Sequence, residues 1–155
     1  MYLRANDIIS GSEATAYMTV NKENELMFYA TSLTATATKE KISLKTLGKR
    51  GTQYKTNGWS GSGKMTIYYA TSRFRELMSD YISNGIETPF SIMVTNEDPT
   101  STLGKEEVVL KNVTLNSVVM TAFDVSKNIL SEEISFTFDD IELLSTFTLP
   151  EFGEV

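Results

Sequence analysis

Residues 58–65 read GWSGSGKM, a glycine-rich run with the spacing of a phosphate-binding P-loop. In a P-loop, backbone amides hold the phosphates, the lysine reaches the terminal phosphate, and a following Ser or Thr binds Mg²⁺. Gly58, Gly63 and Lys64 fit this spacing, but Met65 stands at the metal-ligand position. A P-loop also follows a buried strand and begins a helix. Here the preceding KRGTQYKTN is too polar for a buried strand and the following MTIYYAT alternates like a strand, so the context argues against a nucleotide site.

The chain has no histidine and no cysteine, which limits the kinds of catalytic site that it could form. This removes Ser-His-Asp and Cys-His catalysis and zinc sites with nitrogen and sulfur ligands. Adjacent carboxylates, Glu132–Glu133 and Asp139–Asp140, point to opposite faces of a strand and do not converge on one bond. The acidic turn 96–98 lacks the spacing of a calcium loop, and turn chemistry before Pro99 already explains it. We therefore expect no enzyme, no metal site and no cofactor.

Length and charge set further limits. A chain of 155 residues predicts a single domain, 1–155. The net charge of −6 argues against a protein that grips nucleic acid by its phosphates, although nucleic acid could still slide past it. The sequence lacks a membrane-spanning apolar run and a signal-peptide pattern at its beginning, so we expect no membrane anchor. The lack of cysteine fits a reducing cytoplasm.

One helix is predicted over residues 72–84. Thr71 or Ser72 can cap its start, and Gly85 suits a left-handed end. Arg73 and Arg75 should lie on the outward face, against a partner or against water. The helix carries one apolar stripe, expected to lie in the core, formed by Phe74, Leu77, Met78, Tyr81 and Ile82.

The remaining segments read as strands, and the expected fold is mainly β: a small β-sandwich or barrel with one flanking α-helix. Residues 26–46 form a long strand with a bulge near 38–40, and residues 107–122 change parity along their length. In the cleanest strand, 129–142, Ile134, Phe136 and Phe138 should face the core. Strands this long leave unpaired backbone edges, so we expect something outside the monomer to complete the sheet.

Several runs together resemble the tail tube protein of contractile phage tails, in the PBSX-like defective-prophage and phage-tail-like bacteriocin branch. These are TLGKRGTQYKTNGWSGSGKMTIYYATSRFRELM, MVTNEDPTSTLGK, VVM and EEISFTFDD, and the likeness covers residues 8–145. The resemblance implies a structural subunit whose strands complete a shared barrel in a hexameric ring. Rings would stack into a hollow tube that a contractile sheath drives through the target envelope, conducting DNA in a phage or ions in a bacteriocin.

The resemblance also implies partners and a location. The partners would be further copies of the chain, the sheath protein, and tape-measure, baseplate and tail-terminator proteins, with DNA only as non-specific passing cargo. The protein would lie in a virion tail or a phage-tail-like particle assembled in the bacterial cytoplasm.

The polar segment 46–63 is predicted to be a long loop. In the resembled family the corresponding loop reaches the adjacent ring, which makes an inter-ring clasp the favoured role. Its glycines would allow positive φ and close backbone approach: Gly51, Gly58, Gly61 and Gly63. A mobile surface loop with Trp59 tucked into its own core is the alternative. The residues expected to make the inter-ring contact are Lys49, Arg50, Gly51, Tyr54, Lys55 and Trp59. The acidic groups expected to receive them are Glu97, Asp98, Glu106 and Glu107.

The polar face of the strand 129–142 would line the lumen, where carboxylates repel a polyanion. A solvated outer surface is the alternative for the same residues, which are Glu133, Ser135, Thr137 and Asp139. Two other classes of protein stay open. A monomeric β-sandwich binding module, for example for carbohydrate, would use Tyr54, Trp59 and Tyr68 as a stacking platform. A small hydrolase would need two acids within about 5 to 9 Å across strands.

Overall fold

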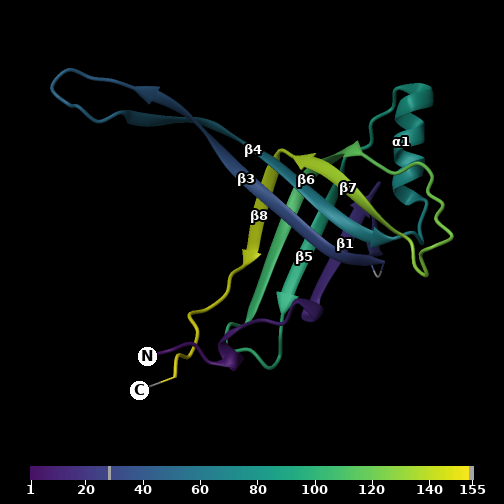
Figure 1. Ribbon diagram of the computed structural model, residues 1–155, viewed down its shortest axis with the longest axis horizontal. Helices are drawn as coiled ribbons and strands as arrows, with labels where there is room; N and C mark the ends of the chain where they lie inside the picture. The colour runs from purple at the N-terminus through teal and green to yellow at the C-terminus, as the bar shows by residue number, and fades with distance from the viewer. Residues whose placement is uncertain (28, 154–155) are drawn as a thin grey trace.

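The computed structural model describes residues 1–27 and 29–153, and within them the fold is mainly β with one α-helix. Figure 1 shows a two-layered β body from which one hairpin extends far to the side. The strands are β1 (Ala14–Val20), β2 (Glu23–Leu26), β3 (Ala30–Leu44), β4 (Gln53–Tyr68), β5 (Phe90–Glu97), β6 (Lys105–Ser117), β7 (Ser131–Phe138) and β8 (Asp140–Ser145). The helix is α1 (Arg73–Asn84), and two 3-10 turns, Ala5–Asp7 and Gly11–Glu13, precede β1.

All strand pairs are antiparallel, in the order β2-β1-β5-β6-β7-β4-β3, and β8 pairs with β6. Strand β6 belongs to both layers. Its first part pairs with β5 and β8, and its last part pairs with β7. In Figure 1, β3 and β4 cross in front of the layer that contains β5, β6 and β8. The prediction of a small mainly β fold with one helix is confirmed.

A local distortion lets β6 serve both layers. Asn112 has a positive φ of 54°, and its side-chain amide donates a hydrogen bond to Asp139, which separates β7 from β8. The irregular residue shifts the parity of β6, so Leu110 and Val113 are both buried although they are three positions apart. This is the parity change that the sequence predicts within residues 107–122.

The core lies between the two layers. Met65, Ile67, Ile134 and Phe136 from one layer are buried together with residues such as Ile92 from the other. The alternation of β7 is confirmed, because Ile134, Phe136 and Phe138 are all buried. Burial of side chains of this size is the main favourable term in folding.

Gly61 and Gly63 on β4 lie opposite Phe138 and Phe136 on β7. A Cβ at position 61 would lie 2.4 Å from the Phe138 ring, and one at position 63 would lie 2.4 Å from the Phe136 ring. Each glycine therefore gives space to an aromatic ring from the neighbouring strand. The P-loop-like spacing reflects this packing. Of the four glycines expected to allow positive φ or a close approach, Gly58 has the positive φ, 110°, while Gly61 and Gly63 allow the close approach of a neighbouring strand.

Helix α1 has the predicted span and ends at Gly85, whose φ of 67° is left-handed. Phe74 is buried between Tyr29 and Phe90, with ring centroids 6.3 and 6.2 Å away. The rest of the predicted stripe is less covered. Leu77 and Met78 are half-buried, and the expectation that Tyr81 and Ile82 are core is wrong, because they are 54% and 66% exposed.

Arg75 does not lie on the outward face as predicted. Its guanidinium lies 2.6 Å from a carboxylate oxygen of Glu132 and stacks 4.3 Å from the centre of the Tyr69 ring. Glu132 is buried, so its charge needs this partner. Arg73 is more exposed and lies 3.7 Å from Glu25.

The predicted loop 46–63 is mostly strand. β4 begins at Gln53 and pairs with β3 as far as Leu44, so only residues 45–52 connect the two strands. The predicted bulge is confirmed by a register shift between Lys39 and Lys41. Because both faces of this part of the hairpin are exposed, the polar residues form a strand without the alternation that normally reveals one.

Candidate functional site

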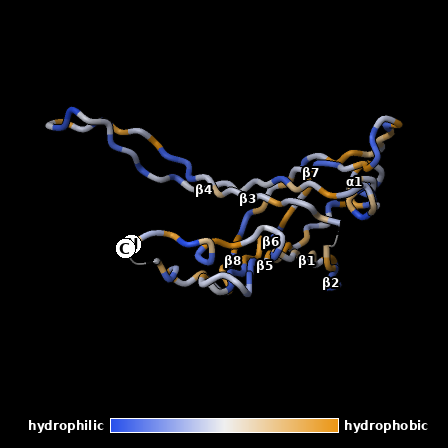
Figure 2. Tube along the Cα trace, turned by 60° about the horizontal axis from the view of Figure 1, so that its bottom comes forward, coloured by the Kyte–Doolittle hydropathy of each residue, from blue (hydrophilic) through white to orange (hydrophobic). Residues whose placement is uncertain are grey.

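The most prominent feature is the outer part of the β3–β4 hairpin, residues 39–58, which is called the arm below. Figures 1 and 2 show the arm extending away from the body, with mainly hydrophilic residues along it. Of the described residues, no other segment reaches so far from the body. The two strands support each other by their mutual hydrogen bonds, which run from Lys41↔Thr56 to Leu44↔Gln53.

Charge is divided sharply between the arm and the body. The arm contains six basic side chains and one acidic one, which leaves 8 basic and 19 acidic side chains for the rest of the chain. The formal charges are thus +5 for the arm and −11 for the remainder. Such a division favours contact between the arm of one molecule and the body of another. The charged residues of the arm are Lys39, Glu40, Lys41, Lys45, Lys49, Arg50 and Lys55.

The residues predicted for the inter-ring contact lie on two parts of the arm and at its base. Lys49, Arg50 and Gly51 are in the exposed connection, and Tyr54 and Lys55 follow on β4, also exposed. Sequence reasoning missed the tip itself, where Leu47 is fully exposed and Gly48 has the positive φ of the turn, 85°. The sequence did contain a sign of this tip, because Leu47 is a lone apolar residue among basic residues in a polar segment.

Trp59 lies at the base of the arm. Its ring centroid is 6.0 Å from that of Phe138, and 41% of the side chain is exposed. Trp59 therefore joins the arm to the core while leaving part of its surface open. It lies nine residues from Tyr68 along an extended strand, roughly 30 Å at about 3.3 Å per residue. The three aromatic residues of the binding-module alternative do not form one platform.

The side of β7, β4 and β3 that faces away from the core is polar, and it is called the polar face below. Ser135 and Thr137 share hydrogen bonds with Ser117 and Thr114 of β6, at 2.6 and 3.1 Å. Glu133 lies opposite Thr66 and beside Lys64, 3.6 Å from its ammonium group. Further small polar side chains continue the face across the sheet: Ser32, Thr34, Thr36, Ser62 and Thr66.

This face is close to neutral rather than strongly acidic. Lys64 balances Glu133, and Asp139 lies at the break between β7 and β8, where it accepts a hydrogen bond from Asn112. Three of the four predicted lumen residues thus share one surface with many hydroxyls, whereas Asp139 lies at its edge. The surface offers hydrogen bonds with little net charge.

The four acidic residues predicted to contact the arm of another molecule differ in how free their carboxylates are to do so. Asp98 is buried and accepts hydrogen bonds from the backbone of Ser10 and from Thr100, at 2.6 to 3.0 Å. The hydrogen bond from the Thr100 hydroxyl, followed by those from backbone amides, lowers the pKa of Asp98. Asp98 therefore stabilises a turn. Glu107 lies 2.7 Å from Lys105, which leaves Glu97 and Glu106 as the more accessible pair.

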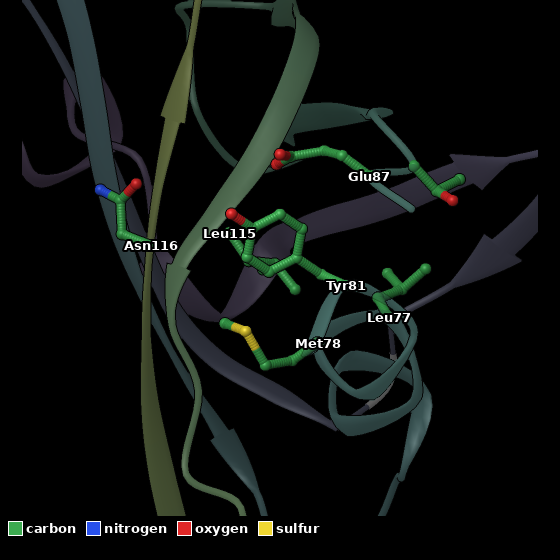
Figure 3. Close-up of a pocket in the computed structure, with 7 residues that line it drawn as sticks. Leu77, Met78, Tyr81, Glu87, Leu115 and Asn116 are labelled. Carbon is green, nitrogen blue, oxygen red and sulfur yellow. The ribbon is translucent and has the colours of Figure 1, made fainter. Parts of the chain in front are cut away.

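A groove between α1 and β6 was not predicted. Figure 3 shows Met78 and Tyr81 of the helix pointing toward Leu115 of β6, with Glu87 beside them. The groove is open to solvent and combines apolar side chains with one carboxylate at its side. The residues that line it are Leu77, Met78, Tyr81, Glu87, Thr88, Leu115 and Asn116.

Within residues 1–27 and 29–153, none of the helices has the length and apolar character needed to cross a membrane. In the same part of the chain, no three His, Cys, Asp or Glu side chains come together as a metal site would require.

Comparison with known proteins gives a family and a fold. Residues 1–145 match the family described as "Phage tail tube protein". The PBSX phage-like element protein XkdM of Bacillus subtilis (strain 168) is 34% identical over 143 residues, which is 92% of this chain and 95% of that protein.

Two solved structures have the same fold. A chain of the anti-feeding prophage baseplate, solved with 6-fold symmetry, gives a TM-score of 0.66 at 12% identity and covers 93% of this chain and 97% of its own length. A chain of the sheath–tube complex of the PVC extracellular contractile injection system gives a TM-score of 0.67 at 14% identity, with coverage of 92% and 95%.

Proposed function

The chain belongs to the phage tail tube protein family, and from this premise we propose that it is the ring-forming subunit of the inner tube of a contractile phage tail or phage-tail-like particle. Membership confirms the resemblance noted in the sequence. In the proposed assembly, six copies close a ring and rings stack into a hollow tube. The 6-fold baseplate structure that contains a similar chain supports the ring size.

The observation that carries the proposal is the unfinished edge of β3. Within the described residues, β3 pairs with β4 on one side and has no strand on the other. The strand has 15 residues, an edge of roughly 50 Å at about 3.4 Å per residue. Natural proteins rarely leave so long an edge exposed, because it recruits other strands.

A shorter free edge exists within the described residues at the other end of the same layer. Strand β5 stops pairing with β6 at Val113, while β6 continues to Ser117 with β7 as its partner in the described part of the chain. The β3 edge of one copy would pair there with its neighbour. Each copy would then contribute β3, β4, β7 and the end of β6 to one closed barrel, which removes the free edges.

The polar face defined above would line the lumen of that barrel. Its hydroxyls exchange hydrogen bonds with water, and its paired charges give a passing polyanion no strong attachment. DNA in a phage, or ions in a bacteriocin, would move along this surface. The opposite face of the same layer is already covered by the core, as a lumen-lining sheet requires.

The remaining partners follow from the assembly. The arm would contact the adjacent ring, and the outer surface of the tube would face a contractile sheath, which the similar chain from a sheath–tube complex supports. The two ends of the tube would meet baseplate and terminator proteins, and a tape-measure protein would set its length. The role is structural, with no catalytic step.

Electron microscopy of the purified protein tests the proposal. Rings with 6-fold symmetry or hollow tubes are expected, and light scattering should show association that increases with protein concentration. A compact monomer at every concentration, with no rings in micrographs, would contradict the proposal and favour a monomeric module.

A further inference from the structure

A hollow lies between the beginning of β3 and the strands β1 and β5, beside the free edge of β3. Its volume is about 620 Å³, and a cavity of about 150 Å³ already holds a benzene ring. Ala16, Leu33 and Val94 line the hollow and pack against the core, so the core is open to solvent at this side of the subunit. None of the residues that the structure places around the hollow is charged. The hollow therefore fits an uncharged, apolar group.

The connection between β6 and β7, residues 118–130, carries apolar side chains that its own molecule leaves uncovered. Phe123 and Val125 are 87% and 86% exposed. Between them, Asp124 accepts hydrogen bonds from the backbone amide and the hydroxyl of Ser126, at 3.0 and 2.6 Å. These bonds fix a turn, 123–126, which holds both apolar side chains in place. Neighbouring exposed apolar side chains of this kind are typical of a contact surface.

The turn and the hollow do not meet within one molecule. Among the described residues, none from 118–130 lines the hollow. The turn has one acidic residue, and the next charged residue along the connection, Lys127, offsets it. An uncharged hollow and a nearly neutral apolar turn suit each other, so a second copy of the chain is the partner that the two surfaces fit.

The directions of the strands determine where a neighbouring copy would place its turn. Successive strands of this layer are antiparallel, so β3 begins at the end of the layer where β6 finishes. One row of paired residues crosses the layer: Ser117, Ser135, Lys64 and Thr34. If the β3 edge of one copy pairs with the end of β6 in the next, the residues that follow β6 in that neighbour come beside the beginning of β3. Residues 30–33 at this beginning line the hollow.

The connection also leaves β6 at a suitable depth. Val118, the first residue after β6, packs against the core rather than on the polar face. In one closed barrel the core side of each subunit continues into the core side of the next. The hollow lies on this side of the layer, behind β3. The neighbour that pairs with the β3 edge is therefore also the one whose turn reaches the hollow.

We propose that, within a ring, Phe123 and Val125 of one subunit enter the hollow between β3 and the β1–β5 pair of the next subunit. The end of β6 pairs with the β3 edge, and the turn that follows closes the space behind that edge, so one partner makes both contacts. This inference rests on the proposed ring. It adds to the backbone hydrogen bonds of the shared barrel a contact that buries apolar surface and completes the core of each subunit.

Cysteine cross-linking tests the contact, because the natural chain contains no cysteine. Ala14 is exposed, lies on the core side of β1 and lines the hollow. A Phe123→Cys, Ala14→Cys double variant is assembled and treated with a short bismaleimide. The expected product is a ladder of covalent multimers on a denaturing gel that ends at the hexamer, because links within a ring of six join only six chains. Links between rings would extend the ladder further.

The control pair is Phe123→Cys with Tyr17→Cys. Tyr17 lies on the same strand as Ala14, is 37% exposed and does not line the hollow. This pair and each single-cysteine variant should stay largely monomeric. No ladder from the test pair, an equal ladder from the control pair, or a ladder that continues past the hexamer would overturn the contact, while rings in micrographs would leave the proposed function standing. If the natural protein forms no rings, both proposals are overturned.

A substitution without cross-linking provides the second measurement if the cysteine variants do not assemble. Phe123→Ser should raise the protein concentration at which half of the subunits are in rings by about tenfold, since it removes the largest apolar group of the contact. Leu149→Ser is the matched control, because Leu149 is equally exposed, at 86%, and lies in neither the turn nor the hollow. Sedimentation velocity measures the association, and the melting temperature of the dissociated protein should stay the same in both variants. Equal association of the two variants would overturn the contact.

Discussion

Gly63 on β4 lies directly opposite Phe136 on β7, and the phenyl ring occupies the space that a side chain at position 63 would need. The backbone oxygen of Thr34, on the other neighbouring strand, would lie 2.7 Å from the same Cβ. The position is thus closed on two sides. Gly61 has the same relation to Phe138, which makes the pair a packing unit between two strands.

Gly63→Ala should destabilise the protein by about 1 to 3 kcal/mol, because an added methyl group forces the Phe136 ring and the β3 backbone to move. Urea or thermal unfolding measures the change. Gly51→Ala is the matched control. A Cβ there would be 3.9 Å from the Lys49 side chain, so its stability should stay within about 0.5 kcal/mol of the natural protein. Equal stability of the two variants would contradict the packing argument.

Arg75→Ala should cost about 3 to 5 kcal/mol, because it leaves the carboxylate of Glu132 buried without its cation. Arg73→Ala, which removes a more exposed partner of Glu25, should cost at most about 1 kcal/mol. Unfolding in urea compares the two. A double variant, Arg75→Met with Glu132→Leu, should be more stable than Arg75→Ala. The opposite order would show that the charge of Glu132 is not what makes the site sensitive.

Acid should loosen the attachment of the N-terminal segment to the turn after β5. Hydrogen bonds from Thr100 and Ser10 lower the pKa of Asp98 in the folded protein. A lowered pKa means that the carboxylate adds stability above the ordinary value of about 3.9, and that this stability is lost as the pH falls through the lower folded value. Hydrogen exchange at the Ser10 and Thr100 amides should therefore lose protection as the pH falls below the ordinary value and through the lower folded pKa of Asp98.

Asp98→Asn should show weakened protection of these amides already at neutral pH. Asp124→Asn removes a comparable turn carboxylate, which accepts hydrogen bonds from Ser126, and should leave them unchanged. Full protection of Ser10 in Asp98→Asn would disprove the role of this carboxylate.

Shortening the arm should separate folding from tube formation. Replacing residues 43–54 by Asn-Gly joins Ile42 to Lys55, which already pair, through a favoured two-residue hairpin turn. The replaced residues are outside the hydrophobic core, so the melting temperature should change little. Tube length in electron micrographs should fall sharply. Tubes of normal length from this variant would show that the arm does not join rings.

The sequence predicts secondary structure best where one face of an element is buried. The span of α1, the inward residues of β7 and the parity change within β6 all follow from apolar spacing beside a buried face, and the structure confirms them. The first strand of the arm lies within the predicted strand 26–46, but residues 46–58 were predicted as a loop, because both faces of the arm meet water and no alternation is left to detect.

Two other errors have different physical causes. The reason for glycine at position 61 lies in Phe138, a contact between residues far apart in the sequence that a single sequence does not reveal. Tyr81 and Ile82 follow the helical spacing of core residues but remain exposed in an isolated chain. Periodicity identifies an apolar face without showing whether the same molecule covers it. The proposed lumen, arm and acidic surfaces stay predictions until assembly is measured.

The sharing of β6 by both layers has a mechanical consequence. Before Asn112, β6 pairs with β5 and β8 of one layer, and after it β6 pairs with β7 of the other layer. Sliding one layer over the other would therefore break hydrogen bonds along a single continuous strand. Each subunit should therefore resist shear as one stiff block. In the proposed tube, a column of such blocks would transmit a push from its base to its leading end with little loss to internal deformation.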